Sequence, residues 1–156
     1  MNLLKKIDLN ELLKRQSMLD EKFKEKMGIE KLDPKLIKVA YLDEVGELIH
    51  ELKPLWCYWK KEHKEIDKQR ALEELSDCLH FALSYDNTKI TKLLGVFIKT
   101  HPDNIITLLD KLKNIETSIS TICEILEVLE IPTEEFLEVH HQVWLRNMNI
   151  RTGDDY

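Results

Sequence analysis

Scarcity of glycine and proline is the feature that most constrains the fold of this chain. Its 156 residues contain four of each, whereas a β fold needs these residues at its many tight turns. Abundant Leu, Glu, Lys and Ile favour helices. No segment alternates apolar and polar residues convincingly with a period of two, the pattern typical of a half-buried strand. We therefore predict an all-α fold, a bundle of about five to six helices.

Helix boundaries are marked by a few residues. Asp33 and Pro34 are suited to the N-cap and first position of a helix, and Pro54 favours its end, because the residue before a proline avoids the helical region. Asp86-Asn87 and His101-Pro102 are expected breaks. The first five predicted helices span about 9–27, 34–52, 69–84, 88–99 and 103–129, the last of them with a polar kink at 114–118. A sixth helix starts within 131–135 and reaches about 147, and a polar tail follows over about 148–156.

Length and charge narrow the possible functions. A chain of this length suits one domain, residues 1–156. Its 23 Lys and Arg against 29 Asp and Glu leave a net charge of −6, which argues against a binder of nucleic-acid polymers. No apolar stretch has the length of a signal peptide or a membrane span, so we expect no membrane partner and a cytoplasmic location.

The three cysteines do not suggest a metal centre or a disulfide framework. Cys57, Cys78 and Cys123 are far apart, odd in number and never paired as CxxC. Reduced thiols are the expected state in the cytosol.

Two predicted helices carry the same spacing of acidic residues. Glu44 and Glu47 form ExxE on one, and Glu74 and Asp77 form ExxD on the next. Residues three apart share one helix face, so each pair can direct two carboxylates toward one point. Such pairs also arise by chance on solvated faces in a chain that is 33% charged.

The position of Glu74 on its helix favours a specific site. A helical projection places Glu74 inside the apolar stripe, between Phe81 and Cys78, and places Glu44 at the edge of its own stripe. A buried carboxylate must be protonated, paired with a cation or bound to metal. Four carboxylates brought together would suit Mg²⁺ or Mn²⁺ rather than Zn²⁺.

Further motifs accompany these acids. His80-Phe81 follow Asp77, the aromatic segment 56–60 ends in Trp59-Lys60, and the opening helix contains Gln16 within 12–20. With them, the first half of the chain resembles the dimeric all-α dUTPase family, a branch of the all-α NTP pyrophosphatases that also includes MazG-like proteins and dCTP pyrophosphatases.

This resemblance implies hydrolysis of dUTP to dUMP and pyrophosphate by a homodimer that uses two or more Mg²⁺ ions. It implies that Glu44, Glu47, Glu74 and Asp77 bind the metal. Glu47 would also position or deprotonate the attacking water. Trp59, with Trp56 as the alternative, would stack on uracil. The residues expected to contact substrate are Gln16, Trp59, Lys60, His80, Arg146, Asn149 and Arg151, the last three in a compressed version of the family's C-terminal phosphate-binding segment.

Other functions stay open. The same chemistry could serve dCTP or non-standard nucleotides. A di-iron carboxylate protein is suggested by three acid-x-x-His pairs, which begin at Glu47, Asp77 and Glu138. A non-catalytic helical module is the third alternative.

Overall fold

The computed structural model describes residues 6–91, 96 and 101–151. Within them the structure is all α, without a strand, which confirms the predicted fold class. The main helices are α1 (Lys6–Met27), α2 (Pro34–Glu51), α3 (Lys68–Asn87), α4 (Ile105–Leu112), α5 (Ser118–Val128) and α6 (Thr133–Arg146). Short helical turns are η1 (Lys53–Leu55), η2 (Ile115–Thr117) and η3 (Asn147–Arg151). No helix in the described ranges is both long and apolar enough to cross a membrane.

Capping residues set the beginnings of α2 and α3. The Asp33 side chain accepts a hydrogen bond from the Lys35 backbone N–H at 2.9 Å, as predicted for an N-cap. Asp67 does the same for Arg70 at 3.1 Å. The end of α3 was predicted wrongly. The helix continues past Ser84 to Asn87, because Tyr85 and Asp86 are buried and tertiary packing outweighs their weak helix propensity.

Three other predictions need correction. Residues 88–91 and 96 are not helical, and the rest of the predicted helix 88–99 lies outside the described residues. The predicted helix 103–129 is two helices, since the Asn114 side chain accepts from the Glu116 backbone N–H at 3.1 Å and begins η2. Residues 148–151 belong to a π-helical turn rather than a tail, and 152–156 lie outside the described residues.

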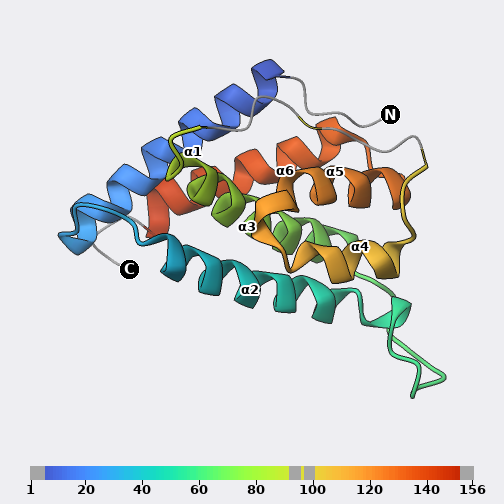
Figure 1. Cartoon of the computed structure of the whole chain (residues 1–156). Coiled ribbons are helices and arrows are strands. Elements are labelled where there is room, and N and C mark those ends of the chain that lie inside the picture. Colours follow the sequence, from blue (N-terminus) through green and yellow to red (C-terminus); the bar gives the residue numbers. More distant parts are fainter. Residues whose placement is uncertain (1–5, 92–95, 97–100, 152–156) are drawn as a thin grey trace.

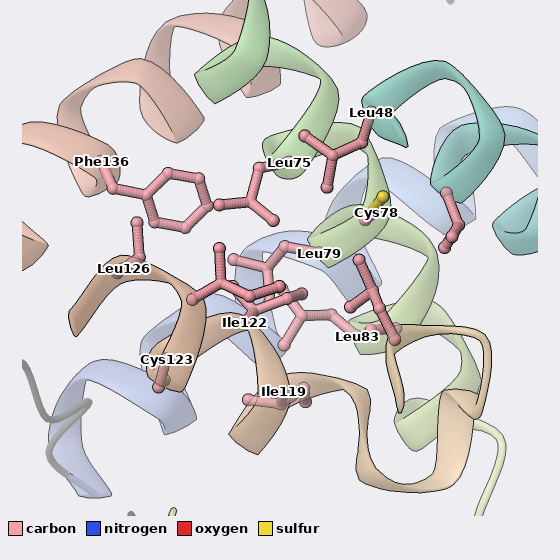
Figure 2. Packing of buried hydrophobic residues seen from close by; sticks show 14 of the residues in the cluster. Leu48, Leu75, Cys78, Leu79, Leu83, Ile119, Ile122, Cys123, Leu126 and Phe136 are labelled. Atoms are coloured by element: carbon pink, nitrogen blue, oxygen red, sulfur yellow. The ribbon is translucent and has the colours of Figure 1, made fainter. Parts of the chain in front are cut away.

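Helix α3 lies at the centre of the bundle and packs against α1, α2, α5 and α6 (Figure 1). Its apolar face includes Leu75, Leu79 and Leu83, which meet Ile122 and Phe136 in the core (Figure 2). α1 and α2 diverge from the turn at Gly28 and lie on either side of α3 (Figure 1). The φ of Gly28 is 65°, a value that glycine adopts readily. This arrangement leaves the other face of α3 between α1 and α2.

Tyr41 ties α2 to the end of α4. Its side chain is fully buried, and its hydroxyl donates to the Leu112 carbonyl. We predict that Tyr41→Phe lowers the free energy of unfolding by about 1–2 kcal/mol, because a buried carbonyl loses its donor. Urea denaturation measures this loss. Tyr58→Phe is the matched control, since Tyr58 is 91% exposed and its hydroxyl is not needed for packing. Equal stability of the two variants would contradict the role of Tyr41.

Candidate active site

Polar side chains follow one face of α3 from end to end. Arg70, Glu74, Asp77, His80 and Ser84 succeed one another at steps of three or four residues. This spacing keeps them on one side of the helix. The face therefore changes along its length from a cation, through two acids, to an imidazole and a hydroxyl.

Three of the four predicted carboxylates come together between α2 and α3. Glu44, Glu74 and Asp77 are half-buried, and one oxygen of each lies within 4.8 Å of the others. Glu47, one turn beyond Glu44 on α2, is exposed and lies outside this set. Its charge still acts on the pKa values of both Glu44 and Glu74, which places it at the edge of the cluster.

Burial and mutual repulsion disfavour the charged forms of these acids. Burial first, then the charges of Asp77 and Glu74, raise the pKa of Glu44 to about 7. Burial and Asp77 also raise the pKa of Glu74, and Arg70 offsets part of this because its Nη2 lies 3.9 Å from a Glu74 oxygen. A divalent cation would relieve the repulsion, and an all-oxygen donor set fits Mg²⁺ or Mn²⁺.

A cavity of about 300 Å³ adjoins the carboxylates. Glu44 and Asp77 belong to its wall, together with Gln16 and His80. The remaining lining residues are Leu19, Asp20, Phe23, Leu32, Ile37, Phe81, Ser84 and Asn147. We call this space the α1–α3 cavity. Apolar walls with a few polar groups are typical of a pocket for a small organic ligand.

Hydrogen bonds within the protein occupy the Gln16 amide. Its Nε2 donates to Asp20 at 2.9 Å and to Ser84 at 3.0 Å, and its Oε1 lies 2.7 Å from His80 Nδ1. Burial raises the pKa of Asp20, and the hydrogen bonds from Ser84 and Gln16 counteract this. Gln16 therefore lines the cavity, and its amide holds neighbouring side chains, while its predicted contact with the substrate stays a prediction.

Asn147 is a site residue that the sequence alone did not reveal. It is 6% exposed and lines the α1–α3 cavity from η3, and its Oδ1 has no hydrogen-bond partner within the described residues. A buried amide oxygen without a partner is costly unless a ligand supplies a donor. The resemblance covers the segment around Asn147, but the compressed spacing of that segment does not show which of its asparagines corresponds to the family's. Of the predicted contacts there, Arg146 and Asn149 are exposed, and the Arg151 side chain lies outside the described residues.

Trp59 and Lys60 lie away from this cavity, on the loop between η1 and α3 that projects beyond the end of α2 (Figure 1). Trp59 is 59% exposed and contacts Trp56, with ring centroids 5.7 Å apart. Trp56 donates to the Ile49 carbonyl at 2.7 Å and packs on the core. Lys60 instead lines a second cavity of about 580 Å³, which also contains Arg70.

The acid-x-x-His pairs do not form one metal centre. His50 is exposed, and His141 contacts Arg15 between α1 and α6, with 3.0 Å between Nδ1 and the guanidinium. His80 lines the α1–α3 cavity, and the group of possible metal ligands found in the described part of the chain contains no histidine. This arrangement does not favour a di-iron site.

Comparison with known proteins gives a match to a protein family. A family model described as dUTPase matches residues 8–152, nearly the whole chain. No curated protein matches the sequence. The family match extends the resemblance from the acidic motifs to the C-terminal turn that contains Asn147. The chain therefore belongs to the all-α dUTPase family and is a dUTP diphosphatase.

Proposed function

We propose that the enzyme hydrolyses dUTP to dUMP and pyrophosphate with Mg²⁺ held by Glu44, Glu47, Glu74 and Asp77. The observation that carries this proposal is the position of the acids at the wall of an apolar cavity: Glu44 and Asp77 belong to both. A triphosphate cannot approach an acidic cluster without cations, whereas its nucleoside can enter the cavity. Mn²⁺ has the same ligand preference and is an acceptable substitute.

The order of groups along α3 gives the bound nucleotide a direction. The nucleoside would lie near His80 and Ser84, and the α-phosphate near Glu74 and Asp77. The β- and γ-phosphates would then extend toward Arg70 and the cavity that contains Lys60. Arg70 donates to Glu51 at 3.0 Å, and this contact keeps its guanidinium at the end of the acidic cluster.

Bound Mg²⁺ would neutralise the acids, polarise the α-phosphorus and lower the pKa of the attacking water. Glu47 would accept the proton of that water, because it is the exposed carboxylate beside the cluster and is accessible to solvent. Attack in line with the leaving group breaks the bond between the α-phosphorus and the bridging oxygen. Arg70 and Lys60 would stabilise the charge that develops on pyrophosphate.

The wall of the α1–α3 cavity supports recognition of the base by Asn147. Its unpartnered Oδ1 can accept from the N3–H of uracil, and the amide can also donate to a carbonyl of the base. Phe81 offers an aromatic surface in the same cavity, which is the role the sequence predicted for Trp59. Stacking by Trp59 or Trp56 stays a prediction, and so do the phosphate contacts of Arg146, Asn149 and Arg151.

Homodimerisation also stays a prediction. The segment 105–129 is rich in Ile and Leu, but it contributes mostly to the core of the single chain: Leu108, Leu112 and Ile122 are buried. The exposed apolar residues of α2 are a better basis for pairing, because Leu36, Val39 and Leu42 share one outward face and are each more than half exposed.

Product analysis tests the proposed reaction. With dUTP and Mg²⁺ we expect dUMP and pyrophosphate in equal amounts, no orthophosphate, and no turnover after EDTA treatment until Mg²⁺ or Mn²⁺ is restored. Parallel assays with dCTP and dTTP measure base selectivity. Equal turnover of dCTP would instead favour a broader pyrophosphatase, and orthophosphate release would exclude attack on the α-phosphorus.

Substitution of the acids tests the metal site. Glu44→Gln and Glu74→Gln are expected to lower kcat/KM at least about 100-fold, because each removes a charged ligand. Circular dichroism should show an intact fold, with unchanged or raised thermal stability as repulsion is relieved. Glu73→Gln is the matched control: this neighbour of Glu74 accepts from Gln69 and lies outside the cluster. Full activity of either cluster variant would argue for a non-catalytic module.

Asn147→Ala tests base recognition. We expect KM for dUTP to rise about tenfold with a smaller change in kcat, because a hydrogen bond to the base is lost while the acids remain. Asn10→Ala, on the exposed face of α1, is the control. Steady-state kinetics of both variants tests whether Asn147 contacts the base. An unchanged KM for Asn147→Ala would assign the base contact to another residue.

A further inference from the structure

A second buried imidazole lies directly behind His80. His140, on α6, is 4% exposed, and its ring stacks on that of His80 with centroids 4.2 Å apart and planes at 27°. Phe136 covers His140 from within α6, at 6.2 Å between ring centroids. His140 is absent from the lining of the α1–α3 cavity. It therefore does not contact a ligand there directly.

Each imidazole is anchored separately. The Gln16 Nε2 donates to Asp20 and Ser84, so Oε1 is the atom that faces His80 Nδ1. A carbonyl oxygen only accepts, and the hydrogen of His80 must therefore be on Nδ1. The His140 Nδ1 lies 2.8 Å from the Ser76 hydroxyl. Ser76 precedes Asp77 on α3, so the anchor of His140 is on the helix that carries the acids.

The surroundings of His140 keep its ring neutral. Burial, together with His80, Arg15 and His141, lowers its pKa well below the ordinary value for histidine. A neutral ring can lie flat against His80 without charge repulsion. On its far side, His140 lines a separate cavity of about 200 Å³ between α1 and α6, where Asp8 and Glu11 also lie.

We propose that His140 is a positioning residue for the nucleoside end of the site: its stacked ring holds His80 against Gln16, and so holds the hydrogen-bonded group of Gln16, Asp20 and Ser84 in the cavity wall. This inference rests on the proposed function, because it assumes that the α1–α3 cavity receives the nucleoside. Without the ring of His140, His80 has an empty space on one face and can rotate away from Gln16. The Gln16 oxygen then loses its donor, and the polar wall loses its order.

Ring variants separate stacking from simple filling of space. We expect His140→Phe to keep KM for dUTP near the wild-type value, because a planar ring remains against His80. His140→Leu fills similar space without a planar face, and His140→Ala leaves a void. Both should raise KM about tenfold with kcat changed less than twofold, since the acids are untouched. His141→Ala is the matched control, because its ring stacks on Trp144 instead, at 6.0 Å between centroids.

The ring nitrogens of His80 supply a measurement that does not depend on catalysis. Long-range ¹H–¹⁵N spectra of the wild-type protein should show His80 with its hydrogen on Nδ1. This pattern should persist in His140→Phe and be lost or averaged in His140→Leu. If His140→Ala does not fold, comparison of His140→Phe with His140→Leu still tests whether a planar ring is needed against His80. Equal KM values and equal His80 spectra in those two variants would overturn the inference, whereas absence of dUTP hydrolysis by the wild-type enzyme would instead overturn the proposed function.

Discussion

Burial of α3 on nearly all sides is the constraint on which the rest of this structure depends. A helix in the centre of a bundle must pack one face as core, and every polar side chain on its other face needs a partner. The leucine face of α3 meets α5 and α6 in the core (Figure 2). The side chains of its polar face lie beside residues of three neighbouring helices: Glu44 on α2, Gln16 on α1 and His140 on α6. The site is therefore assembled around one helix.

The carboxylates are an unfavourable arrangement that function can explain. Burial, followed by repulsion from the neighbouring acids, raises the pKa of Glu44 to about 7, so keeping three acids within 4.8 Å lowers the stability of the fold. The nearby cation Arg70 compensates only partly, since its close contact is with Glu51. The divalent cation proposed for this site would neutralise the acids and so account for their close approach.

Prediction from sequence was accurate where local chemistry decides. Asp33 and Pro34 begin α2 because a side-chain acceptor and a fixed φ act within one helical turn. The ExxE and ExxD spacings placed the acids on common faces for the same reason. It was less accurate where distant residues intervene: α3 continues through Asp86 because that residue is buried, and the helix after Asp103 breaks at Asn114 because its side chain caps a new turn.

The sequence by itself determined the helical class, the acidic motifs and the family resemblance, because helix propensity, capping and residue spacing act between near neighbours. Only the tertiary structure decided which groups share a cavity. Gln16 and His80 are 64 residues apart, and their hydrogen bond, the stack of His140 on His80 and the place of Asn147 in the cavity wall depend on how α1, α3 and α6 pack. Packing is a property of whole faces, and it also placed Trp59 and Lys60 outside the lining of the α1–α3 cavity.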